Sequence, residues 1–243
     1  MESEESEGTL TVPWPAFQRF FAERWEPGDH VVLIGPTNSG KTTLAVQLCQ
    51  IRPWVLALDI KGGDRTLAKS GWPRVLKWPL PGKVYDQIQE RHEFRAIIGD
   101  SARGSAAMAR RRLLIHRVLD DVWQQGGWTI LVDDVQLLTD TRRSANLSMQ
   151  LEDFLVAARD AEVSIVSGLQ APRRVPRAAS DQASWLVAFL TRATDVVNRL
   201  AEMAGRPREE IRGAIRGLRR PCVLVVGTDA SEPIIVTRPD RLG

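Results

Sequence analysis

The chain has 243 residues, of which 43% are hydrophobic and 26% charged, as in an ordinary globular protein. The formal net charge of +3 is too small to identify a partner by itself, and no stretch approaches the roughly 20 apolar residues of a membrane span. The two cysteines, Cys49 and Cys222, belong to no Cys/His cluster, which excludes a zinc module or a disulfide scaffold and favours reduced thiols in a cytoplasmic protein.

The N-terminal region is expected to contain a tail followed by a helix. Residues 1–12 begin with an acidic stretch that lacks the basic and apolar parts of a signal peptide, and we expect a disordered tail there. Residues 13–243 are then expected to form one domain. Residues 14–25 carry aromatic side chains at helical spacing, which indicates an amphipathic helix. We expect these aromatic rings to pack in the core in preference to stacking on a ligand.

The strongest motif lies in residues 30–44. An apolar run typical of a buried parallel strand precedes a segment that matches G-x-x-x-x-G-K-[ST] at every fixed position, and a helical pattern follows it. Glycines at this spacing let the backbone wrap around phosphate oxygens, while the N–H groups and the positive helix end face the anion. Lys41 is expected to reach the β- and γ-phosphates, and the Thr42 hydroxyl to ligate Mg²⁺. The expected nucleotide contacts are Gly35, Pro36, Thr37, Asn38, Ser39, Gly40, Lys41, Thr42 and Thr43.

The remaining elements alternate between strands and helices. They are strands at 54–58, 75–78, 95–100, 128–134 and 163–168, helices at 83–94, 105–125 and 146–161, a strand or apolar helix end at 185–190, helices at 195–204 and 208–216, and a hairpin of 222–226 with 233–236. Polar residues 59–64, directly after a strand, are expected at the ligand edge of the sheet. For Arg110, Arg111 and Arg112 a solvated helix face is favoured over contact with a polyanion. The pattern predicts an α/β fold: a mainly parallel sheet flanked by helices, closed by a C-terminal hairpin.

Two further strand ends carry side chains suited to ATP hydrolysis. Asp133 and Asp134 follow an apolar strand about 90 residues after the phosphate loop. Asp133 is expected to hold Mg²⁺, directly or through water, and Asp134 to orient or deprotonate the attacking water. Gln170 follows the next strand, where its amide could bond the γ-phosphate or that water. Solvated loop residues are the alternative for all three.

Five segments occur in a particular order: HVVLIGPTNSGKTTL, LALDIKGGD, TILVDDVQLL, VSIVSGLQAPRRVP and a strand with Phe189. In this order they resemble the FtsK–HerA superfamily of hexameric DNA-pumping ATPases, and the small size is most like its compact viral and mobile-element members. The resemblance covers about residues 28–237. It implies a RecA-like P-loop ATPase that forms a homohexameric ring around double-stranded DNA, with ATP sites between subunits and an arginine finger from the neighbouring subunit.

The chain departs from that pattern at two positions. Asp134 stands where the family usually has Glu, and Ala171 follows Gln170 where the family has Arg. The arginine finger is therefore not fixed by motif. The candidates for it, or for DNA contact, are Arg173, Arg174, Arg177 and Arg192, and a solvated basic loop is the alternative for the first three.

The expected function is that of an Mg²⁺-dependent, DNA-stimulated ATPase that translocates double-stranded DNA, as a genome-packaging or DNA-transfer motor. It would be cytoplasmic, in association with a virion or membrane complex where a portal or membrane protein docks it. The alternative is a nucleotide-dependent switch or assembly ATPase that does not move DNA. A terminase with its own nuclease is disfavoured because no second acidic cluster follows, and a small-molecule kinase because it does not account for LDIKGGD or LQAPRRVP.

Overall fold

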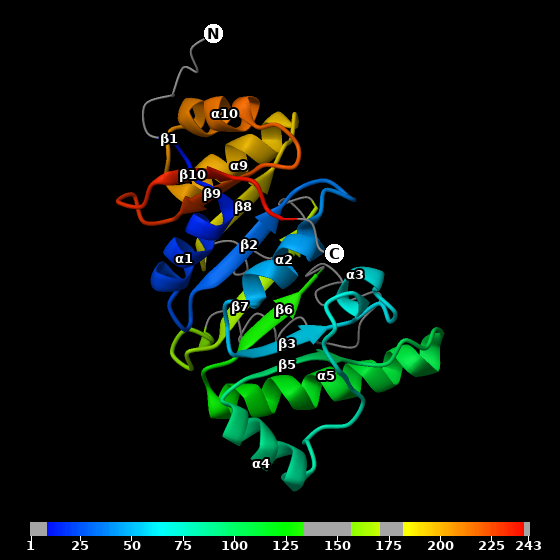
Figure 1. Ribbon diagram of the computed structural model, residues 1–243. Coiled ribbons are helices and arrows are strands. Elements are labelled where there is room, and N and C mark those ends of the chain that lie inside the picture. The colour runs from blue at the N-terminus through cyan, green and yellow to red at the C-terminus, as the bar shows by residue number, and fades with distance from the viewer. Residues whose placement is uncertain (1–8, 134–156, 171–181, 241–243) are drawn as a thin grey trace.

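The computed structural model describes residues 9–133, 157–170 and 182–240 (Figure 1). In these residues one sheet has the strand order β1-β10-β9-β8-β2-β7-β6-β3-β5-β4. The strands are β1 (Thr9–Thr11), β2 (His30–Ile34), β3 (Trp54–Leu58), β4 (Arg74–Val75), β5 (Phe94–Ile98), β6 (Thr129–Val132), β7 (Ser164–Leu169), β8 (Ala183–Phe189), β9 (Val223–Gly227) and β10 (Ile234–Thr237). The helices are α1 (Trp14–Arg24), α2 (Lys41–Cys49), α3 (Arg65–Ala68), α4 (Gly82–Arg91), α5 (Ser105–Gln125), α9 (Thr194–Ala204) and α10 (Arg208–Gly217).

The centre of the sheet is parallel. Strand β2 pairs with β7 on one side and β8 on the other, and the parallel pairing continues through β6, β3, β5 and β4. Strands β9 and β10 continue the sheet beyond β8 in antiparallel pairing, which confirms the C-terminal hairpin. The carboxyl ends of β2, β7, β6 and β3 therefore meet at one edge, where an open α/β sheet binds its ligands.

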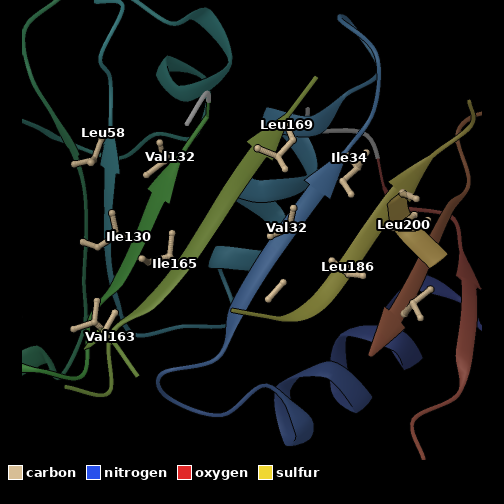
Figure 2. Close-up of a cluster of buried hydrophobic side chains, with 14 of the residues drawn as sticks. Val32, Ile34, Leu58, Ile130, Val132, Val163, Ile165, Leu169, Leu186 and Leu200 are labelled. Atoms are coloured by element: carbon tan, nitrogen blue, oxygen red, sulfur yellow. The ribbon is translucent and has the colours of Figure 1, made fainter. Parts of the chain in front are cut away.

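Each face of the sheet carries its own hydrophobic core, because successive strand residues point to opposite faces. Val32 and Ile34 of β2 face a cluster with Ile130, Leu169 and Leu186, to which α5, α9 and α10 contribute (Figure 2). Their neighbours Val31 and Leu33 face the second cluster, with α1 and α2. Both faces of β2 are covered, so all its residues are buried and the strand reads as a continuous apolar run.

Helix α1 supports the sheet with aromatic side chains. Phe17 stacks between Trp14 and Phe21, with ring centroids 5.4 and 5.3 Å apart, and Phe21 meets the edge of Trp185 from β8. Phe17 and Phe21 are fully buried in the cluster that includes α2. The predicted helix and the preference for core packing are both confirmed.

The predicted elements within the described residues agree with the structure apart from their ends. Of residues 185–190, which allowed two interpretations, residues 185–189 belong to strand β8 and Leu190 follows it. Residue 94 begins β5 and does not end the preceding helix, and β4 is limited to Arg74–Val75. Helix α3 was not predicted. The expected helix at 146–161 lies mostly outside the described residues.

Two expectations need correction. Residues 9–11, which were assigned to the N-terminal tail, form β1 and pair in parallel with β10 at the edge of the sheet. Arg111 lies on the buried side of α5 with 3% of its surface exposed, and is not part of a solvated face. In the described ranges, no helix is long and apolar enough to cross a bilayer.

Candidate nucleotide site

The phosphate loop joins β2 to α2. Gly40 caps α2 with a φ of 98°, and Asn38 has a φ of 60°, so two residues in the left-handed region curl the loop back over the helix start. The Lys41 ammonium donates to the carbonyl oxygens of Gly35 and Pro36, both at 2.8 Å. Lys41 is mostly buried, and these two bonds hold its charged end against the loop.

The first glycine of the loop is required by packing. A Cβ on Gly35 would come within 2.8 Å of both the Phe189 Cβ and the Ser39 Oγ. Phe189 ends strand β8, which is next to β2, so its side chain packs against the start of the loop. The strand with Phe189 was part of the family resemblance, and this contact gives it a physical role.

A hydroxyl and a carboxylate meet at the start of α2. Asp133 directly follows β6, and its Oδ1 accepts a hydrogen bond from Thr42 Oγ1. The pair supplies two hard oxygen atoms, the ligand type that Mg²⁺ prefers. Among the described residues there is no cluster of three or more His, Cys, Asp or Glu that could hold a metal alone. Mg²⁺ at Thr42 and Asp133 would therefore complete its coordination with phosphate oxygens and water, as is usual for this ion.

Gln170 reaches the phosphate loop from the end of β7. Its Oε1 accepts a hydrogen bond from Thr37 Oγ1 at 3.2 Å. The backbone N–H of Gly35 donates to the carbonyl of Leu169 at 3.1 Å, so the last residue of β7 is tied to the first residue of the loop. The structure thus brings the predicted Gln170 into direct contact with the loop.

These groups line one open cleft of about 440 Å³. Its walls are Thr37, Asn38, Ser39, Gly40, Lys41, Thr42, Thr43, Lys61, Asp64, Thr66, Asp133 and Gln170. The lining is mainly polar and holds two lysines and two aspartates, which suits a phosphate ligand bound together with a cation. Lys61, Asp64 and Thr66 also line the cleft, although they were not among the predicted site residues. The sequence signal for Lys61 and Asp64 was their place in the polar segment 59–64, whereas Thr66, in α3, had no such signal.

The segment after β3 is built around Asp59, whose side chain is almost fully buried. Its carboxylate accepts hydrogen bonds from the N–H groups of Gly62, Gly63 and Asp64 at 3.0, 2.8 and 3.2 Å, and pairs with Arg74 at 2.9 Å. Asp59 is thus occupied with holding its own loop.

Five predicted residues lie either outside the described part of the chain or at another cavity. Asp134, Arg173, Arg174 and Arg177 lie outside the described residues, and their roles stay predictions. Arg192 is exposed after β8 and lines a separate cavity of about 460 Å³ with Arg212 and Arg216 of α10.

A parallel sheet with this loop between β2 and α2, and an acidic residue after β6, is the fold of the P-loop NTPases. The genome-packaging NTPase B204 of Sulfolobus turreted icosahedral virus 2, in complex with AMPPCP, has the same fold, with a TM-score of 0.60 and 14% identity over 88% of this chain and 100% of that one. VirB4 of Thermoanaerobacter pseudethanolicus gives a TM-score of 0.57 with 10% identity over 87% and 89%. The pCW3 conjugation coupling protein TcpA, with ATPγS, gives 0.52 with 12% identity over 86% and 59%.

In sequence alone, no protein-family profile and no curated protein matches the chain. At these identities the structural similarity shows the fold, and the fold agrees with the one that the family resemblance implied.

Proposed function

We propose that this protein is an Mg²⁺-dependent ATPase that translocates double-stranded DNA. The observation that carries the ATPase part is the bond between Thr42 and Asp133 inside a polar cleft formed by the phosphate loop. It joins the two halves of a hydrolysis site, which are 91 residues apart in the sequence.

Each group in the cleft has a role in this proposal. Lys41, whose ammonium bonds the carbonyl oxygens of the loop, binds the β- and γ-phosphates of ATP. Bound Mg²⁺ would neutralise charge that develops on the phosphates. Asp134 orients the attacking water. Gln170 senses the γ-phosphate and transmits its loss through Thr37 and the end of β7.

DNA translocation is supported by two independent arguments. The order of five sequence segments resembles the FtsK–HerA superfamily, and the fold is shared with proteins described as a genome-packaging NTPase and a conjugation coupling protein. We infer a homohexameric ring on double-stranded DNA, docked to a portal or membrane protein in the cytoplasm or at a virion. One of the arginines Arg173, Arg174, Arg177 and Arg192 would complete the site of a neighbouring subunit.

The test measures ATP turnover with and without duplex DNA, together with displacement of a third strand from a triplex, which reports movement along the duplex. We expect turnover that rises with DNA and falls steeply with salt, because phosphate contacts release counterions. Lys41→Ala should lose nucleotide binding and turnover, while the control Lys77→Ala, at an exposed position, should behave as the wild type. Slow turnover indifferent to DNA would replace this proposal with the switch or assembly ATPase.

A further inference from the structure

A second lysine enters the cleft from another loop. The Lys61 ammonium lies 3.8 Å from Oδ2 of Asp133, and the other oxygen of the same carboxylate accepts from Thr42. Thr42, Asp133 and Lys61 therefore form a continuous series from the phosphate loop across the cleft. About half of the Lys61 side chain is exposed, so its end has room to move within the cleft.

The backbone of Lys61, in contrast, is held firmly. On its C-terminal side, the three N–H groups of residues 62–64 donate to the buried Asp59 carboxylate. Gly62 and Gly63 have φ values of 77° and 73°, so the turn uses a backbone conformation that glycine adopts without strain. The loop thus fixes the position of the Lys61 Cα while its side chain stays adaptable.

Arg111 of α5 holds the backbone of Lys61 through a second set of contacts. Its guanidinium donates to the Lys61 carbonyl at 3.3 Å, and to Asp100 Oδ1 and the Ala102 carbonyl at 2.6 Å each. The guanidinium packs so closely on Gly62 that a Cβ there would lie 2.6 Å from one of its nitrogens. A buried arginine with these partners links α5, the segment after β5 and the Lys61 loop.

A terminal phosphate in this cleft would bring negative charge close to the Asp133 carboxylate. The two charges repel each other strongly at short range, and a cation between them offsets that repulsion. Lys61, whose end lies beside Asp133, supplies such a cation in addition to the Mg²⁺ that Thr42 and Asp133 would hold. A diphosphate, which lacks that terminal group, would leave the ammonium with Asp133.

We propose that Lys61 binds the terminal phosphate of the nucleotide and makes the site prefer a triphosphate over a diphosphate, and that Arg111 is the positioning residue that holds Lys61 in place. This inference rests on the proposed nucleotide site and adds a residue that distinguishes the two states of the nucleotide.

The experiment compares the affinities of the protein for ATPγS and for ADP. Lys61→Met removes the charge and keeps much of the side-chain volume; it should weaken ATPγS binding about tenfold or more, the size of one lost charge-assisted hydrogen bond. ADP binding should change by less than about twofold, because the lost contact is absent there. Lys61→Arg should retain the preference for ATPγS. The control Lys69→Met, exposed just after α3 and outside the cleft, should leave both affinities unchanged.

Arg111→Lys tests the positioning role. It should lower the ratio of the ATPγS affinity to the ADP affinity, and thermal unfolding should show that the variant is folded. In the double variant with Lys61→Met the ratio should fall little further, since both changes remove one interaction. An unchanged ratio in Lys61→Met would overturn the proposal. Lys41→Ala distinguishes failure of the nucleotide site from failure of the role of Lys61. If Lys41→Ala binds both nucleotides normally, the proposed nucleotide site is wrong. If Lys41→Ala binds neither nucleotide and Lys61→Met keeps the affinity ratio of the wild type, only the role of Lys61 is refuted.

Discussion

Gly168 in β7 lies directly against the backbone of Asp133, with no space for a side chain between the two strands. A Cβ on Gly168 would overlap the Asp133 carbonyl oxygen and lie 3.2 Å from its carbonyl carbon. Because the obstacle is backbone, no rotation of a side chain can relieve it. The close approach of β7 to the end of β6 therefore fixes where the Asp133 carboxylate meets Thr42.

Gly168→Ala should consequently displace Asp133. We expect a loss of stability of about 1–3 kcal/mol, typical of overpacking, and a larger loss in ATP turnover than in nucleotide affinity. Urea unfolding and steady-state kinetics measure both. The matched control is Gly213→Ala in α10, where a Cβ has nothing within 4 Å; it should be neutral or stabilising by up to about 1 kcal/mol. Equal effects of the two substitutions would contradict the packing argument.

Features that depend on a local run of residues could be predicted from the sequence, whereas features that depend on contacts between distant residues could not. The phosphate loop was predictable, because its fixed positions Gly35, Gly40, Lys41 and Thr42 form a pattern within eight consecutive residues. The end of β6 was predictable because an acid after an apolar strand is a local pattern. The burial of Arg111 was not, since its neighbours Arg110 and Arg112 carry the same charge although Arg110 is exposed and Arg112 is only half-buried. What separates Arg111 from them is space left by distant glycines, Gly62 and Gly99, which a Cβ would fill.

Those glycines lead to a second prediction, at Gly62. An alanine there would strain a backbone with a φ of 77° and would also press on the Arg111 guanidinium, which is buried and bonded to Asp100 and Ala102. Gly71→Ala is the matched control, with a φ of 75° and nothing within 4 Å. Both variants should lose about 1–2 kcal/mol from the backbone. Gly62→Ala should lose more than Gly71→Ala in chemical denaturation; similar losses would show that the guanidinium moves aside at little cost.

The hydrogen bond between Arg111 and Asp100 should make the stability of the fold depend on pH. The hydrogen bond from Arg111 lowers the pKa of Asp100 below its ordinary value, against the smaller effect of desolvation. A carboxyl whose pKa is lower in the folded state stabilises the fold above the ordinary pKa of about 4, and this stability is lost as the pH falls through the lower, folded pKa.

Asp100→Asn should therefore lower the free energy of unfolding at pH 7, and the difference from the wild type should shrink as the pH falls below about 4. The measurement is urea unfolding across this pH range. Asp86→Asn, at an exposed position in α4, serves as the control for the loss of a surface carboxylate. A difference for Asp100→Asn that stays constant with pH would indicate that the lost interaction does not depend on the charge.

The two cysteines should differ in reactivity. Cys49 on α2 is fully buried, and desolvation raises the pKa of its thiol far above the ordinary value, which outweighs the opposing effect of Arg52. The thiolate is the reactive form, so Cys49 should be inert at pH 8 in the folded protein. Cys222 is partly exposed and should react.

Mass spectrometry after maleimide treatment should show one modified residue per native chain and two in denaturant. Cys222→Ser should show none until it unfolds. Rapid labelling of Cys49 in the native protein would contradict its placement.

The contact between Gln170 and Thr37 gives the last prediction, which concerns coupling. Gln170 joins the end of β7 to the phosphate loop through one hydrogen bond, and both residues line the cleft. If this amide senses the γ-phosphate, Gln170→Ala should keep ADP affinity within about fivefold of the wild type, because the bond it loses is worth only about 1 kcal/mol or less in an exposed position. Stimulation of turnover by duplex DNA should be lost. Gln124→Ala, at an exposed position on α5, is the matched control and should retain this stimulation.

Thr37→Val removes the hydroxyl at the other end of the bond. It should reproduce the loss only if the signal passes through this contact; full stimulation in Thr37→Val together with its loss in Gln170→Ala would mean that the amide acts on nucleotide or water directly.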